Sequence, residues 1–229
     1  MDLTTRVDNY CERIDPSFWA EPLNAVTNIA FFIAAFVALS AARREGRVEF
    51  LSVGMIFLAL CVGTGSFLFH TFATRWAGLA DTIPILLFIL FYLYAATRRF
   101  LGLPVWLALL APVLFVPFTA AFLQLWAIAL PGVRFSQAYL PVLVALAAYG
   151  AVLRMRGHPA ASWLFAAAGV FFVSLTFRSI DGPVCGSFAT GTHFLWHILN
   201  GVLLGIVMLA FIRHGARGGA RLAMRTARG

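Results

Sequence analysis

Seven apolar segments, each about as long as a bilayer-spanning helix, dominate this sequence. A helix needs about 20 apolar residues to cross the hydrocarbon core, and these segments lack the strict alternation typical of barrel strands. They cover residues 22–42, 50–71, 79–97, 103–123, 135–153, 160–178 and 191–212. The fourth segment contains Pro104, Pro112 and Pro117, which predict a kinked helix that its neighbours must support. The sequence therefore predicts an all-α membrane protein, a bundle of seven transmembrane helices.

The composition agrees with this prediction and argues against a nucleic-acid partner. The 229 residues are 62% hydrophobic and 11% charged, whereas a soluble domain is roughly 25% charged. The net charge of +8 comes from 17 basic residues, all Arg, most of which lie between or after the apolar segments. That distribution is typical of topology determinants and of contacts with anionic lipid headgroups. We expect an acidic segment over residues 1–21, a helical domain over 22–213 and an Arg-rich tail over 214–229.

The distribution of Arg predicts the orientation of the bundle. One side carries twelve of them: Arg43, Arg44, Arg47, Arg98, Arg99, Arg154, Arg156, Arg213, Arg217, Arg221, Arg225 and Arg228. The other side carries five: Arg6, Arg13, Arg75, Arg134 and Arg178. By the positive-inside rule, the N-terminus lies outside and the C-terminus is cytoplasmic.

Five polar residues inside the apolar segments converge on the outer end of this predicted bundle. His193 and His197 are four residues apart in GTHFLWHILN, so they lie on one helix face. Ser66 and His70, in GTGSFLFH, end the second segment, and Asp81 begins the third. Polar groups inside a membrane are costly and are candidates for a functional site.

Three histidines from two helices can fill three positions of a tetrahedral zinc ion and leave the fourth for water. Zinc lowers the pKa of bound water to about 7 and polarises a carbonyl, as amide or ester hydrolysis requires. Asp81 is then a general base or an orienter of the water, and Ser66 is an oxyanion donor. The structural alternatives are core histidines that bond to neighbouring helices, and a Ser66 that only allows close packing. Bis-histidine haem and a Ser–His hydrolase fit the spacing less well.

The N-terminal segment is rich in oxygen ligands. Asp8, Asn9, Glu12, Asp15, Glu21 and Asn24 lie within 17 residues. Such a cluster suits calcium, which takes six to eight oxygens, although the spacing is not that of an EF-hand. The alternative is a solvated acidic tail in which Glu21 caps the first helix near its positive end.

Two of the three cysteines, Cys11 and Cys185, fall on the predicted outer face. An oxidising compartment there would permit them to pair. Cys61 lies in the middle of an apolar segment, and we expect it to be a buried apolar residue.

Several strings together resemble the alkaline ceramidases, seven-helix hydrolases related to the adiponectin-type receptors. These strings are YCE…AEPLNAVTN, GTGSFLFH with an Asp eleven residues after its histidine, and HFLWH. The resemblance implies an intramembrane zinc held by His70, His193 and His197, with Ser66 and Asp81 as catalytic partners. It also implies a Cys11–Cys185 disulfide and a calcium site near the zinc, for which the candidates are Asp8, Asn9, Tyr10 (through its carbonyl), Glu12, Asp15 and Glu21. Ile14 stands where the family has Asn.

The sequence thus predicts an intramembrane zinc amidohydrolase that cleaves a ceramide-like lipid to a fatty acid and a sphingoid base. A non-catalytic lipid-binding receptor on the same scaffold, and a hydrolase of another lipid amide or ester, are the alternatives. The absence of Lys and the abundance of Arg and Ala favour a high-GC bacterium. We therefore expect a multi-pass protein of a bacterial inner membrane, with its active site toward the outer leaflet.

Overall fold

The computed structural model describes residues 2–132 and 135–215, and this part of the chain is helical. The helices are α1 Pro22–Thr27, α2 Ile29–Arg44, α3 Phe50–Phe72, α4 Arg75–Arg99, α5 Val105–Ala129, α6 Leu140–Met155, α7 Ala160–Val184 and α8 His193–His214. A short 3-10 turn, η1 Gln137–Tyr139, leads into α6. Seven helical stretches are long and apolar enough to cross a membrane, with α1 and α2 together forming one stretch and η1 and α6 another. The predicted seven-helix fold class is confirmed.

The helix boundaries differ from the predicted segments at several ends, including that of α5, which runs on to Ala129, past the predicted end at residue 123. The first span breaks at Asn28, where α1 gives way to α2. α4 begins at Arg75, before the predicted start at residue 79, so Asp81 lies inside the helix rather than at its first turn. α7 runs on to Val184, past the predicted end at residue 178. Hydropathy locates the apolar part of a helix but not the polar turns that continue it, because those turns are stabilised by tertiary contacts.

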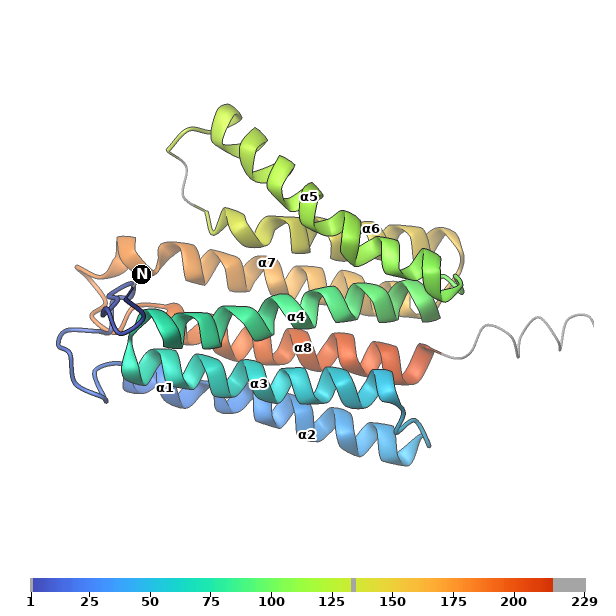
Figure 1. The fold of residues 1–229 in the computed structure, drawn as a ribbon, viewed down its shortest axis with the longest axis horizontal. Helices are drawn as coiled ribbons and strands as arrows, with labels where there is room; N and C mark the ends of the chain where they lie inside the picture. The colour runs from blue at the N-terminus through green and yellow to red at the C-terminus, as the bar shows by residue number, and fades with distance from the viewer. Residues whose placement is uncertain (1, 133–134, 216–229) are drawn as a thin grey trace, which may run out of the picture.

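The long helices run up and down along one common direction (Figure 1). Successive helices from α2 to α5 pack against one another, α6 packs on α7 and α7 on α8, and α8 packs against α2. α5 leans away from α6 toward the end of the bundle where the N-terminus lies (Figure 1). α5 is continuous through Pro112 and Pro117. α8 is the most buried of the spans and carries two of the three predicted metal ligands into the interior.

Small residues bring α3 very close to α4. A Cβ added to Gly65 would lie 1.9 Å from the carbonyl oxygen of Ala80. Glycine is therefore required at position 65, and the contact sets Ser66 of α3 beside Asp81 of α4. Close approach at small residues is typical of helix packing in membranes, where dispersion replaces the hydrophobic driving force.

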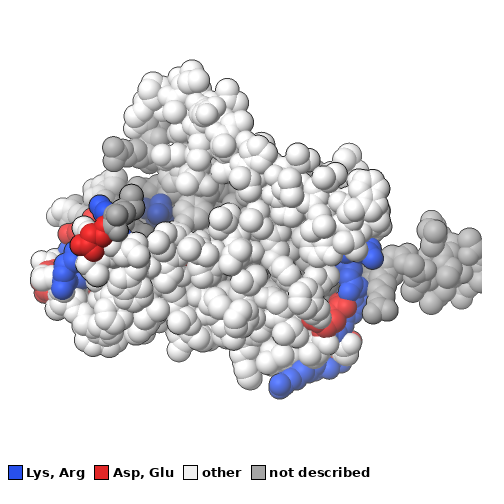
Figure 2. Space-filling model, viewed as in Figure 1, with Lys and Arg blue, Asp and Glu red and all other residues white. Residues whose placement is uncertain are grey.

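Charged side chains gather at the two ends of the bundle, and the flank between them is apolar (Figure 2). Large apolar side chains of the spans, such as Phe36 of α2, Phe57 of α3 and Leu125 of α5, are exposed, as lipid contact requires. The predicted Arg-rich tail lies outside the described residues from position 216 onward.

Candidate metal centre

Three buried histidines meet at the end of the bundle that the N-terminal segment covers. His70 lies in the last turn of α3, and His193 and His197 lie in the first turns of α8. Each offers a ring nitrogen, and these nitrogens all lie within 4.8 Å of one another. Within the described residues, this is the only group of three or more His, Cys, Asp or Glu placed to hold a metal ion. The side chains that the sequence predicted as ligands are thus brought together and can bind a metal.

The donor set fits a metal because two ring nitrogens have no other partner. His70 Nε2 and His193 Nδ1 are buried and make no hydrogen bond with the protein. A buried polar atom without a partner costs free energy, about 1–3 kcal/mol, which a bound metal ion would remove. The opposite nitrogens of two rings are held by the chain: His70 Nδ1 lies 2.6 Å from Glu21 Oε2, and His197 Nδ1 lies 3.1 Å from Thr27 Oγ1. Metal-binding histidines usually have such partners.

Asp181 fixes the start of α8 and was missed by the sequence analysis. Its Oδ1 accepts hydrogen bonds from the backbone N–H of Thr192 at 2.7 Å and of His193 at 2.9 Å. Its Oδ2 accepts one from the N–H of Cys11 at 3.0 Å. Gly191, at φ +61°, must be glycine, since a Cβ would lie 2.2 Å from Asp181 Oδ1. The signal in the sequence was an acidic residue twelve positions before the first residue of the helix that carries HFLWH.

Ser66 and Asp81 lie beside the histidines, as the sequence predicted. Both line a cavity that His197 also lines. Ser66 is only 4% exposed. A carboxylate and a hydroxyl therefore face the same space as the candidate metal ligands.

Two cavities meet at this point. The first is apolar and extends between α4, α6 and α8 along residues such as Phe88 and Leu203. The second, at the N-terminal end of the bundle, is lined by Tyr10, His193 and Arg178 among others. Four residues line both: Asp81, Ile85, Tyr139 and Trp196.

Arg178 is a further residue that the sequence analysis used only to predict orientation. Its guanidinium lies 5.2 Å from the ring centroid of Tyr139 and 5.4 Å from that of Trp196. It donates a hydrogen bond to Ser136 Oγ at 3.1 Å. A cation is thus held over two aromatic faces at the wall of the second cavity, an arrangement that only the tertiary structure creates.

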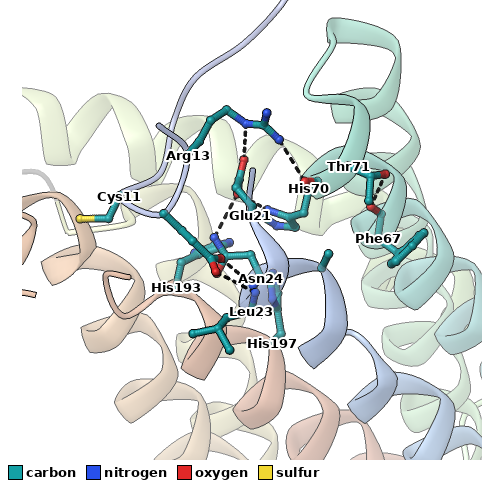
Figure 3. Close-up of polar contacts among 12 residues, drawn as sticks. Cys11, Arg13, Glu21, Leu23, Asn24, Phe67, His70, Thr71, His193 and His197 are labelled. Atoms are coloured by element: carbon teal, nitrogen blue, oxygen red, sulfur yellow. Dashed lines mark hydrogen bonds and ion pairs between the residues drawn. The ribbon is translucent and has the colours of Figure 1, made fainter. Parts of the chain in front are cut away.

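The N-terminal segment folds over the histidines and is joined to α7 by the disulfide Cys11–Cys185. That disulfide was predicted. Its neighbour Tyr10 stacks on the ring of His193, and burial raises the pKa of the Tyr10 hydroxyl. Arg13, also buried, contacts Glu21 and the C-terminal end of α3 (Figure 3). Glu12, Arg13 and Glu21 are therefore packed into the protein, whereas Asp8 and Asp15 are exposed to solvent.

The predicted calcium ligands are divided between the surface and the interior. Asp8, Asn9 and Asp15 are exposed, whereas Glu12 and Glu21 are buried. Within the described residues, the acidic side chains of this segment do not form a cluster of three. The Asp15 carboxylate accepts a hydrogen bond from the backbone N–H of Ser17 at 2.6 Å. Hydrogen bonding with Ser17 lowers the pKa of Asp15.

Glu12, not Glu21, caps the first helix. Glu12 Oε1 accepts the N–H of Leu23 at 2.7 Å, and Oε2 accepts the N–H of Asn24 at 2.8 Å. Glu21 makes no side-chain cap, because its carboxylate is directed at His70 and Arg13. Burial raises the pKa of Glu12 against the effect of its two backbone hydrogen bonds. Burial alone would also raise the pKa of Glu21, but its bonds with His70, Asn24 and Arg13 lower it.

Comparison with known proteins adds a family assignment to this geometry. A protein-family model described as Ceramidase matches residues 4–224, nearly the whole chain. No curated protein matches the chain.

Proposed function

The chain belongs to the ceramidase family, and we propose that it is a membrane-embedded, zinc-dependent amidohydrolase. Family membership supports hydrolysis of ceramide in general, which is cleavage of an amide bond. The proposed products are a fatty acid and a sphingoid base. The observation that carries the proposal is the meeting of three histidine nitrogens within 4.8 Å of one another. One of these histidines, His197, lines the same cavity as Ser66 and Asp81.

Zinc suits the three imidazoles better than the hard cations do, because imidazole nitrogen is a common zinc ligand and calcium and magnesium prefer oxygen. His70, His193 and His197 would hold the ion. When bound, zinc acts as a Lewis acid toward the carbonyl and makes a nucleophile available at neutral pH. Three protein ligands are the usual number in a catalytic zinc site, since the fourth position stays free for water or substrate.

Asp81 and Ser66 supply the remaining chemistry in this proposal. The Asp81 carboxylate accepts the proton of the attacking water and delivers it to the leaving amine. The Ser66 hydroxyl donates a hydrogen bond to the substrate carbonyl oxygen, which gains negative charge in the transition state. Ser66 is buried and Asp81 is partly buried beside apolar residues, which strengthens these interactions because the local dielectric constant is low.

The two cavities fit the two parts of a lipid amide. The apolar cavity, lined by side chains such as Phe88, Leu203 and Val207, would take a hydrocarbon chain. The second cavity, with Arg178 and Tyr139, would take polar groups of the substrate. Asp81 lines both, so an amide that bridges the junction would lie against the catalytic carboxylate.

The distribution of Arg supports an orientation with this site in the outer leaflet. Arg43, Arg44, Arg98 and Arg99 all lie in the last turns of helices at the end of the bundle opposite the histidines. We propose that this Arg-rich end faces the cytoplasm of a bacterium. Labelling of single cysteines placed at each end would test the orientation, and a cytoplasmic N-terminus would contradict it.

The function is tested with purified protein in detergent or lipid, ceramide as substrate, and metal analysis of the same sample. The wild type should contain zinc and release fatty acid, and His197→Ala should lose both. His214→Ala is the matched control, because His214 lies at the far end of α8 and should leave both unchanged. Wild-type protein that holds zinc but releases fatty acid from neither ceramide nor any other lipid amide or ester would favour the receptor alternative. Faster release from an ester or another amide would favour the other hydrolase.

A further inference from the structure

Arg13 is a buried cation surrounded by oxygens. Its Nε donates to Glu21 Oε1 at 2.6 Å, and its terminal nitrogens donate to three backbone carbonyls. These are the carbonyls of Asp15 at 3.2 Å, Ser17 at 3.3 Å and His70 at 3.0 Å. The side chain is only 5% exposed. One carboxylate oxygen and three carbonyl oxygens thus converge on one guanidinium, and Figure 3 shows the contacts with Glu21 and with the His70 carbonyl.

The carbonyl of His70 is available because α3 ends just after it. The last four carbonyls of a helix have no partner within the helix, and α3 ends at Phe72, with Ala73 in the left-handed region at φ 47°. The guanidinium satisfies the His70 carbonyl and places a positive charge at the negative end of the helix dipole. Arg13 therefore contacts the backbone of the residue whose side chain belongs to the candidate metal centre.

A second route from Arg13 to the same histidine passes through Glu21. One oxygen of the Glu21 carboxylate accepts from Arg13, and the other lies 2.6 Å from His70 Nδ1 and accepts from Asn24 Nδ2 at 3.0 Å. With Nδ1 of His70 engaged by the carboxylate, Nε2 is the ring nitrogen left for a metal, and it has no other partner. Arg13 fixes the orientation of Glu21, and Glu21 fixes the ring of His70.

These contacts do not fit a calcium ion in the N-terminal segment, although the family resemblance implies one. The four carboxylate oxygens of the two buried acids all accept from N–H groups, Glu12 from the start of α1 and Glu21 from Arg13, His70 and Asn24. The remaining acidic candidates are exposed. A calcium ion beside Glu21 would also be repelled by the buried guanidinium, because both are cations in a poorly hydrated site.

We propose that the Arg13 guanidinium takes the place of a bound calcium ion in this segment. Arg13 is also a positioning residue for His70. The segment is then folded over the metal centre without calcium. The inference rests on the proposed zinc site, but its readouts do not require turnover of a lipid.

The first experiment uses the wild-type protein. Metal analysis should find zinc and no stoichiometric calcium, and addition of millimolar calcium chloride to the zinc-loaded protein should leave Tm unchanged. Stoichiometric calcium, or a rise in Tm that saturates with calcium and not with magnesium, would overturn the proposal. Absence of zinc from the wild type would instead count against the proposed function.

The second experiment measures the zinc dissociation constant by competition with a chromophoric chelator. Loss of a residue that orients a metal ligand typically weakens metal binding 10–100-fold, and Arg13→Ala should do so. Guanidinium ion at low millimolar concentration should restore part of the affinity to Arg13→Ala and not to the wild type. Arg6→Ala, which removes an exposed Arg of the same segment, is the matched control and should bind zinc as the wild type does. Equal zinc affinity in Arg13→Ala and wild type would overturn the positioning role.

Two more variants keep the test decisive if Arg13→Ala does not fold. Arg13→Lys keeps the charge but cannot reach all four oxygens with its single ammonium, so it should fold and bind zinc more weakly than the wild type. In a Glu21→Gln background, Arg13→Lys should weaken zinc binding less than it does in the wild type, because the route through Glu21 is already weakened and only the contact with the His70 carbonyl remains. Fully additive effects of the two substitutions would contradict the route through Glu21.

Discussion

Tyr10 stacks face to face on His193, with the two ring centroids 3.7 Å apart and the ring planes 18° from parallel. Tyr10 belongs to the N-terminal segment and His193 to the first turn of α8, so this pair joins the N-terminal segment to the last helix at the metal centre. The same tyrosine lies 5.2 Å from the ring of His70. One aromatic side chain thus covers two of the three candidate ligands and limits their access to water.

Removal of this ring should weaken the metal centre without abolishing it. An aromatic pair contributes about 0.5–1.5 kcal/mol beyond the area it buries, so Tyr10→Ala should weaken zinc binding by up to about tenfold. Tyr10→Phe keeps the stack and should bind zinc as the wild type does. Competition with a chromophoric chelator measures both variants. If Tyr10→Phe lost as much zinc affinity as Tyr10→Ala, the hydroxyl and not the stacked ring would be what stabilises the metal centre.

Asp181 should be essential for the start of α8. Asp181→Ala leaves the buried N–H groups of Thr192 and His193 without an acceptor, which costs about 1–3 kcal/mol for each group left unpaired. The free energy of unfolding should fall by at least that amount, and zinc binding should weaken because His193 loses its anchor. Asp181→Asn retains one acceptor oxygen, so its free energy of unfolding should fall less than that of Asp181→Ala. Denaturant unfolding in detergent measures the difference, and equal stability of the two variants would argue against the backbone contacts.

The close contact of α3 and α4 should be intolerant of a single methyl group. Gly65→Ala would place its Cβ 1.9 Å from the Ala80 carbonyl oxygen, so the helices must separate, at a typical cost of about 1–3 kcal/mol for overpacking. Ser66 and Asp81 would then move apart, and ceramide hydrolysis should fall by more than tenfold. Gly169→Ala in α7 is the matched control, since a Cβ there meets no atom within 4 Å. It should keep activity and Tm, and a loss of activity in the control equal to that of Gly65→Ala would contradict the steric explanation.

The raised pKa of Glu12 predicts the sign of its contribution to stability against pH. Burial is the main cause of the rise from the ordinary value of 4.5. Between that value and the higher folded-state pKa, the folded protein retains a proton that the unfolded chain has released. The folded state then binds more protons, so the contribution of Glu12 to stability falls as pH rises through this window.

Glu12→Gln has no titrating group at position 12, so a comparison of its stability with that of the wild type isolates the contribution of Glu12. The stability of the wild type relative to Glu12→Gln should decrease as pH rises from 4.5 and then level off above the folded-state pKa. Thermal unfolding of both proteins across that pH range measures this difference in stability. Protonation of the histidines affects both proteins alike and therefore cancels in the difference. A relative stability that increases with pH would show that the hydrogen bonds from Leu23 and Asn24 outweigh the effect of burial.

Much of the fold and the metal ligands could be predicted because their signals are local. Span length and hydropathy report the cost of exposing backbone to hydrocarbon, and the i, i+4 spacing of His193 and His197 places both on one face of α8. His70 was predicted from its place at the end of its segment. Asp181 and Arg178 were missed as site residues, because an acidic residue in a predicted loop and a basic residue at a span end both have ordinary explanations.

The sequence by itself determined the seven helices, their alternating direction and the histidines that could share one ion, since apolar length and helical period act within each segment. Only the tertiary structure decided what the N-terminal segment does. Its charged residues could have been solvated, held a calcium ion or paired with one another, and nothing local distinguishes these outcomes. The choice depends on a helix that ends with an unpaired carbonyl at His70, on Glu21 held against that histidine, and on Arg13 lying where both can be reached. Long-range partners of this kind are fixed only when the chain has packed, because a buried charge is stable only where its partners are already in place.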